Sequence, residues 1–172
     1  MTDLKRLFWG FVTIWGSLPL VLLLGAPSFY VGKNLPAAYF LALVASTALT
    51  YAVKSLWFRP RPDNETGLRP PSPVNGPAEW PRLADPRVAW RFFKCVDASS
   101  FPSVHSARVF QIAVLYGAAL EGVIWTALFL GLAGLIGWSR VVRRRHHPTD
   151  VLAGAFVGVV LGLAANALRE YM

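Results

Sequence analysis

Long stretches without a charged side chain are the feature that most restricts the fold of this chain. Arg6 and Lys33 are separated by 26 uncharged residues, and Lys33 and Lys54 by 20. Because a helix rises about 1.5 Å per residue and the hydrocarbon core of a bilayer is about 30 Å thick, helices of this length can cross a membrane. One shorter run reaches that length only when it is extended back to Pro102. The sequence therefore predicts spans at about residues 7–26, 35–53, 103–120, 122–139 and 151–168.

The composition supports a membrane location. Hydrophobic residues make up 55% of the chain and charged residues 15%, against about 25% charged in soluble domains. The net charge of +8 can indicate nucleic acid, but with so apolar a chain it favours anionic groups at a bilayer surface, and we expect no nucleic-acid partner. A single cysteine, Cys95, excludes an internal disulfide framework. We predict an all-α, multi-span transmembrane bundle that forms one domain over residues 1–172.

Prolines mark a kink and a long connection. Pro19 lies inside the first uncharged run and is expected to kink that helix without ending it. Eight of the 13 prolines lie between residues 54 and 101, together with most of the acidic residues. This composition predicts an extramembrane loop, in which the basic and aromatic stretch 90–94 is expected to lie along the membrane surface.

Three groups of reactive side chains stand at the ends of predicted spans, in residues 54–62, 100–108 and 139–150. The second span ends on the side of the membrane from which the third begins, and the fourth returns to that side. We therefore expect all three groups on one face of the membrane.

Fixed cations dominate these groups. Lys54, Arg61 and Arg140 have few carboxylates near them in sequence, which suits an anion with several oxygens, above all phosphate. A helix that begins at Pro102 would add free N–H groups at its positive end.

Two histidines are more than phosphate binding needs. One of His105 and His146 can attack phosphorus while the other protonates the leaving oxygen. Asp150, four residues after His146, can hold that imidazole in one tautomer.

The order and spacing of these residues resemble the three signatures of the type-2 phosphatidic acid phosphatase and vanadium haloperoxidase superfamily. The matching segments are Lys54-x6-Arg61-Pro62, Pro102-Ser103-x-His105 and Ser139-Arg140-x5-His146-x3-Asp150. The resemblance implies a helical bundle that hydrolyses phosphomonoesters or diphosphates without a metal ion or cofactor.

The resemblance also implies roles. His146 would be the nucleophile that becomes phosphohistidine, Asp150 its partner and His105 the general acid. The substrate phosphate would be bound by Lys54, Arg61, Ser103, Val104 and Arg140.

Two features depart from the family pattern. Val104 occupies a position that is normally glycine, which matters only if the turn needs a positive φ. The chain also has five predicted spans where membrane members usually have six.

Each residue taken alone has a simpler interpretation. Lys54, Arg59 and Arg61 resemble interfacial cations at a helix end. His105 resembles an interfacial polar residue, and Asp150 a carboxylate that stabilises a helix N-terminus. These interpretations do not explain one shared spacing pattern, so we favour a membrane lipid phosphatase. The alternatives are a vanadate-dependent haloperoxidase-like enzyme and a catalytically impaired, non-enzymatic membrane relative.

Substrate and topology are predicted less directly. The stretch around Pro102–His105 and the segment Arg-Pro-Arg-Pro look most similar to relatives that act on isoprenoid diphosphates, with phosphatidic acid and phosphatidylglycerol phosphate as alternatives. The expected location is the inner membrane of a bacterial or archaeal cell. Because all basic residues except Lys33 and Arg169 fall on the active-site face, charge predicts a cytoplasmic site. The resemblance implies the outer face, where many bacterial members work.

Overall fold

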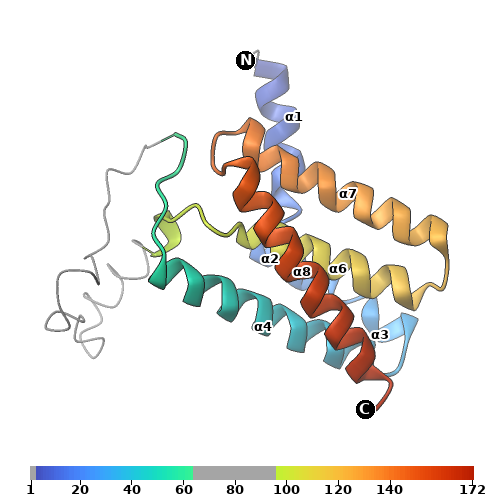
Figure 1. Cartoon of the computed structure of the whole chain (residues 1–172). Helices are drawn as coiled ribbons and strands as arrows, with labels where there is room; N and C mark the ends of the chain where they lie inside the picture. Colours follow the sequence, from blue (N-terminus) through green and yellow to red (C-terminus); the bar gives the residue numbers. More distant parts are fainter. Residues whose placement is uncertain (1–2, 64–95) are drawn as a thin grey trace, which may run out of the picture.

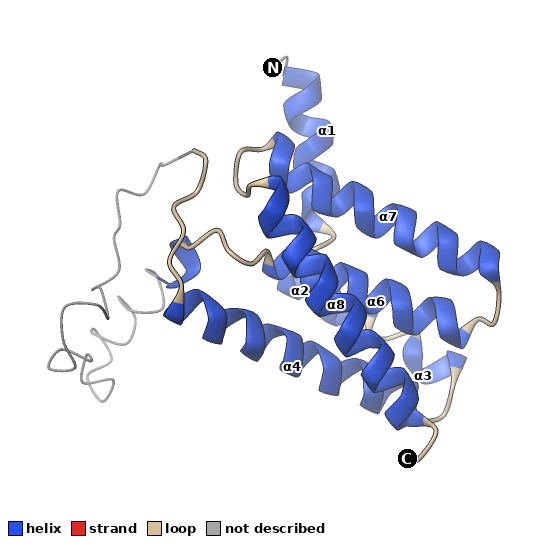
Figure 2. Ribbon diagram, in the orientation of Figure 1, coloured by secondary structure: helices blue, strands red, loops and turns tan. Residues whose placement is uncertain are grey.

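The computed structural model describes residues 3–63 and 96–172, which are helical and contain no strand (Figures 1 and 2). The helices are α1 (Asp3–Ile14), α2 (Leu18–Leu24), α3 (Ser28–Val31), α4 (Leu35–Leu56), α6 (Val104–Ala119), α7 (Val123–Val142) and α8 (Pro148–Arg169). The predicted all-α class is confirmed. Cys95, the stretch 90–94 and most of the predicted loop 54–101 lie outside the described residues.

Helix α6 is the centre of the bundle. It packs against α8, α7 and α4, and α8 also packs along α4 (Figure 1). Where α4 meets α6 the interior is apolar. Tyr39 of α4 and Leu115 of α6 are fully buried there, with Val21 of α2 closing one side. Because lipid chains are as apolar as these side chains, close van der Waals packing rather than removal from water stabilises this contact. Contacts on three sides therefore fix the position of α6.

The outer surfaces of α7 and α8 are apolar. Leu152, Phe156 and Leu163 of α8 are exposed, as are Ile124 and Leu128 of α7. A water-soluble protein rarely exposes a large continuous apolar surface, whereas a bilayer requires one. Helices α4, α7 and α8 are each long and apolar enough to cross a membrane. The chain is an integral membrane protein.

The first predicted span is broken rather than kinked. Helix α1 ends at Ile14 and α2 begins at Leu18, and the segment Leu18–Val31 is bent by 55° from the direction of α1. The expectation that Pro19 kinks a continuous helix was wrong, because this proline lies in the first turn of α2, where its missing N–H has no helical acceptor to lose. Counting the bent pair as one span raises the candidate spans in the described part of the chain from three to four. Helix α6, with 16 residues, is about 24 Å long and lies inside the bundle.

Glycines allow α8 to approach α6 closely. A Cβ atom at Gly154 would collide with the carbonyl of Ser103, and one at Gly158 would collide with the carbonyl of Ala107. Both collisions are with backbone, so side-chain rotation cannot relieve them. Close approach through small residues is the usual way in which membrane helices gain packing contacts. This seam brings the N-terminus of α8 beside the N-terminus of α6.

Candidate active site

The three predicted groups of reactive residues meet at one end of the bundle, and two buried serines join them. Ser100 donates its amide to the Arg59 carbonyl (2.8 Å) and its hydroxyl to the same oxygen (3.1 Å). The ammonium group of Lys54 donates to the Ser99 carbonyl. Lys54 is only 3% exposed, so its charge is held inside the protein. The end of α4 is thereby tied to the segment that precedes α6.

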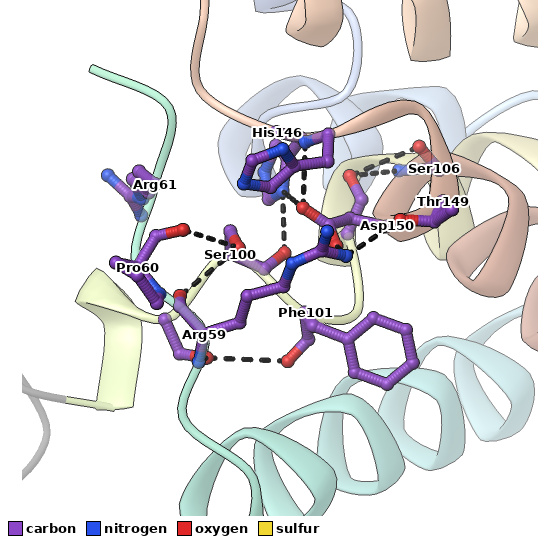
Figure 3. Close-up of polar contacts among 12 residues, drawn as sticks. Arg59, Pro60, Arg61, Ser100, Phe101, Ser106, His146, Thr149 and Asp150 are labelled. Carbon is purple, nitrogen blue, oxygen red and sulfur yellow. Dashed lines mark hydrogen bonds and ion pairs between the residues drawn. The ribbon is translucent and has the colours of Figure 1, made fainter. Parts of the chain in front are cut away.

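His146 is attached to the same serine from the other side. Its Nδ1 lies 2.7 Å from the Ser100 carbonyl oxygen (Figure 3). A carbonyl can only accept, so Nδ1 carries the proton and a neutral ring has its lone pair on Nε2. Burial, followed by the positive charges of Arg140 and Lys54, lowers the pKa of His146 to about 2. The side chain, 4% exposed, is therefore an uncharged base that the cations surround.

Asp150 lies beneath this histidine but binds other groups. It is fully buried, and its Oδ1 accepts from Nη1 of Arg59 at 2.7 Å. Its Oδ2 accepts from the amide of His147 at 2.8 Å and lies 3.9 Å from Nδ1 of His146. The hydrogen bond that we expected Asp150 to make to the imidazole is made by the Ser100 carbonyl instead. Both carboxylate oxygens are already engaged.

The turn that carries the second motif is the start of α6. The helix begins at Val104 rather than at Pro102, and Ser103 is its N-cap, accepting from the amide of Ser106 at 3.4 Å. The amide of Ser103 donates to the Asp150 carbonyl at 2.9 Å. Ser103 is fully buried, so its hydroxyl serves the cap in this arrangement. The first free amides of α6 are those of Val104 and His105.

Val104 fits this turn without strain. It is the first residue of a right-handed helix, and among the described non-glycine residues only Glu121 and Arg144 have positive φ. The glycine of the family pattern is therefore not needed here for its backbone freedom, and valine still supplies its N–H. A β-branched residue in the first turn costs a helix little.

Arg61 and Arg140, the other two predicted phosphate ligands, each have a guanidinium N–H group without an acceptor among the described residues. The Nε atoms of Arg61 and Arg140 are buried and have no hydrogen-bond acceptor within the described residues. Nη2 of Arg61 donates to the Asp97 carbonyl, and Nη1 of Arg140 donates to Oγ1 of Thr13 at 2.7 Å. Both guanidinium groups also lower the pKa of His146, which places their charge close to its ring. Buried donors without acceptors are costly, and an anion would satisfy them.

Helix α1 and the bend after it touch the site from a direction that no motif indicated. Thr13 is buried against Arg140, and a methyl group on Gly16 would lie 2.8 Å from Cδ2 of His105. In Figure 1, α1 lies beside the end of α7 that carries Arg140. The structure therefore adds Thr13 and Gly16 to the residues that surround the predicted catalytic groups.

Arg59 and Ser100 are the other residues whose contacts sequence reasoning missed. Arg59 was interpreted only as an interfacial cation, yet it binds Asp150 and, at 2.7 Å, Oγ1 of Thr149 (Figure 3). Its position two residues before Arg61 was a usable signal. Ser100 acts through its carbonyl, which every residue has, so its identity gave no signal.

Comparison with known proteins finds one matching family model and several relatives that match part of the chain. The family model described as the PAP2 superfamily matches residues 35–171. Lipid A 1-phosphatase of Porphyromonas gingivalis is 38% identical over 38% of this chain and 15% of its own length. YbjG of Escherichia coli (strain K12), which carries the provisional name undecaprenyl-diphosphatase, is 30% identical over 49% of this chain and 42% of its own length. The chain thus spans less than half the length of these curated relatives.

A solved structure extends the likeness to nearly the whole chain. The crystal structure of LpxE from Aquifex aeolicus superposes with a TM-score of 0.70 and 25% sequence identity. The match covers 96% of this chain and 87% of that one, so it includes the helices that precede residue 35.

Proposed function

The chain belongs to the PAP2 superfamily, and on that premise we propose that it is a membrane lipid phosphatase that works through a phosphohistidine. The observation that carries this proposal is the contact between Nδ1 of His146 and the Ser100 carbonyl. It fixes the tautomer whose Nε2 has a free lone pair, and the low pKa of His146 keeps that lone pair unprotonated at neutral pH.

Transfer of the phosphoryl group from the lipid to water takes two steps. In the first, Nε2 of His146 forms a bond to phosphorus and the bond from phosphorus to the lipid oxygen breaks. His105, which the negative charge of the bound phosphate keeps protonated, gives that oxygen a proton. In the second, His105 takes a proton from water, the water oxygen attacks phosphorus and the phosphorus–nitrogen bond breaks. The products are the dephosphorylated lipid and inorganic phosphate, and both histidines return to their starting state.

Charge stabilisation comes from groups that are already in place. Lys54, Arg61 and Arg140 supply three cations, and the amides of Val104 and His105 supply two donors at the positive end of α6. Such preorganised donors stabilise the charge on the equatorial oxygens of the transferring phosphoryl group. The cations would not reorganise during the reaction, because Ser99, Asp97 and Thr13 already hold them.

Asp150 has a supporting role in this proposal. Its contacts to Arg59 and to the amide of His147 fix the turn that carries His146. Its negative charge, 3.9 Å from Nδ1, also stabilises the imidazole as Nε2 becomes bonded to phosphorus. We therefore assign Asp150 to positioning and electrostatic support rather than to a direct hydrogen bond.

The substrate is proposed to be a lipid whose phosphate lies at headgroup depth. The site lies at the end of a bundle whose outer helices are apolar, so a lipid chain can stay in the bilayer while its phosphate reaches His146. The names of the relatives, lipid A 1-phosphatase and undecaprenyl-diphosphatase, support this class. We place the protein in a cell membrane of a bacterial or archaeal type, with the site on the cytoplasmic face by charge.

Phosphate release from purified protein in detergent tests the proposal. A panel of lipid phosphates and p-nitrophenyl phosphate should be hydrolysed with a chelator present, and orthovanadate should inhibit. His146→Ala should abolish turnover, because no phosphohistidine can form. His147→Ala is the matched control and should stay active, since the His147 contact with Oδ2 of Asp150 is made by the backbone amide, which alanine retains. Full activity of His146→Ala, or activity that only added Mg²⁺ restores, would contradict the mechanism.

A further inference from the structure

Arg108 is a buried cation that the catalytic mechanism does not use. It lies on α6 and is 6% exposed. Its Nε donates to Oγ1 of Thr47 on α4 at 3.3 Å. Within residues 3–63 and 96–172, no carboxylate lies at ion-pair distance from it. A charged side chain inside a membrane bundle is costly, which makes such a residue a candidate functional group.

The nearest negative charge is already shared. Asp97 acts on Arg108 electrostatically from beyond ion-pair distance. Its carboxylate lies 3.9 Å from Nη2 of Arg61 and accepts the hydroxyl proton of Tyr51 at 3.1 Å. The Asp97 side chain is 62% exposed, so solvent screens its charge. One exposed carboxylate therefore faces two cations, the buried Arg108 and the half-buried Arg61, and the region keeps a positive excess.

The position of Arg108 relative to the reacting groups is set by the helix. It follows His105 by three residues, so the two side chains are neighbours on the surface of α6. Because α6 starts at the site and runs into the bundle, Arg108 lies about 4.5 Å deeper along the axis. On α4, Thr47 and Tyr51 are one turn apart and lie on the same side, between Lys54 and the interior.

These contacts form a path of polar groups from the phosphate ligands toward the lipid chain. Arg61 contacts Asp97, Asp97 contacts Tyr51, and Thr47, one turn further along α4, contacts Arg108. A lipid that presents its terminal phosphate to His146 must place its next polar group on this inner side, because its chain extends into the bilayer. A guanidinium is well suited to bind a second phosphate there.

We propose that Arg108 binds the phosphate that stays on the lipid, and that the preferred substrate is therefore a lipid diphosphate. This inference rests on the proposed function. Nε2 of His146 bonds to the terminal phosphorus, and the bond from that phosphorus to the bridging oxygen breaks. His105 gives the bridging oxygen its proton, so the first product is the lipid monophosphate, with its remaining phosphate against Arg108. Water then releases the transferred group as inorganic phosphate.

Pairs of substrates that have the same lipid chain but differ in the number of phosphates test this assignment. Wild-type protein should have a kcat/KM about 10- to 100-fold higher on farnesyl diphosphate than on farnesyl monophosphate, the range of one charge-assisted contact. Diacylglycerol diphosphate and phosphatidic acid form a second pair, which shows whether the site accepts a glycerolipid as well as an isoprenoid. Arg108→Gln should lose the preference, with the diphosphate rate falling about 10- to 100-fold and the monophosphate rate changing less than about threefold. Arg108→Lys should retain part of it.

Arg169→Gln is the matched control, because it removes a positive charge at the C-terminal end of α8, away from the site, and should leave the preference unchanged. Equal losses on both members of a pair, or a wild type without preference, would overturn the role of Arg108. If Arg108→Gln does not fold, binding of methylenediphosphonate to the wild-type protein tests the inference. This compound must raise the unfolding temperature at concentrations about 10-fold below the concentrations of inorganic phosphate that give the same increase. A wild type that hydrolyses p-nitrophenyl phosphate through His146 but fails these comparisons refutes only this inference. A wild type that hydrolyses nothing refutes the proposed function.

Discussion

Gly158 in the seam between α6 and α8 and Gly16 in the bend between α1 and α2 are both too crowded for a Cβ atom. At Gly158 the obstacle is backbone, the carbonyl of Ala107 and the amide of Gln111. At Gly16 it is the imidazole ring of His105. Backbone atoms of a packed helix can move only if the helices separate, whereas a ring can turn about its side-chain bonds. The seam therefore determines whether the bundle forms, and the bend determines where one catalytic side chain lies.

The largest effect is expected in the seam. Gly158→Ala should lower the stability of the bundle by about 3 kcal/mol or prevent folding, because overpacking against rigid atoms is costly and the helices cannot separate locally. Thermal unfolding in detergent measures the effect. Gly131→Ala on α7 is the matched control, since a Cβ there meets nothing within 4 Å. An unfolding temperature equal to that of wild type would show that α6 and α8 are less tightly packed than described.

A second prediction concerns the ion pair that crosses the site. Arg59→Gln leaves the buried carboxylate of Asp150 without its 2.7 Å partner and should reduce kcat about 10- to 100-fold. Asp150→Asn should be impaired but measurable. Because both residues act on the same turn, the double variant should be no slower than the slower single variant. Phosphate release measures all three, and losses that multiply would show that Arg59 acts independently of Asp150.

The third prediction is a pH dependence of stability. The pKa of His146 is about 2 in the folded protein and about 6.5 when unfolded, so the unfolded state binds the extra proton. Stability from the neutral ring is complete above pH 6.5 and is lost as the pH falls, at about 1.4 kcal/mol per unit. His146→Gln should lack this part of the slope. The difference in unfolding free energy between the two proteins, measured from pH 7 to pH 5, tests it, and parallel curves would contradict a buried neutral His146.

The sequence predicted the site residues whose side chains have distinctive chemistry. It missed the contacts that depend on backbone groups and on how the helices are arranged. Lys54, Arg61, His146 and Asp150 were predicted together because charge, order and helix ends each restrict where they can lie. The contact of His146 with a carbonyl could not be predicted, since Ser100 supplies backbone rather than a special side chain. The break before Pro19 was missed because proline is compatible both with a kink and with the first turn of a new helix.

The α6–α8 seam was in part visible. Gly154, Gly158 and Gly162 are spaced four residues apart, which places them on one face of a helix. The spacing indicates a close contact but not its partner, and the partner determines the site, because this contact sets Ser103 against the carbonyl of Asp150. Gly16 gave no such signal, as a single glycine in an apolar run is also compatible with an ordinary helix.

The smallest effect is expected at that glycine. Gly16→Ala should leave the unfolding temperature near that of wild type, since the ring of His105 can turn away from the added methyl group, 2.8 Å from Cδ2. A displaced ring is a poorer acid, so hydrolysis of an alkyl phosphate should fall about 3- to 10-fold, a part of the 10²–10⁴-fold that general acid catalysis contributes. p-Nitrophenyl phosphate, whose leaving group needs less protonation, should be affected less. In the His105→Ala background the same substitution should have no further effect, because the side chain that it displaces is gone. A loss of activity that persists in that background, or an equal loss on both substrates, would contradict this prediction. It would show that Gly16 affects folding or phosphate binding rather than the position of His105.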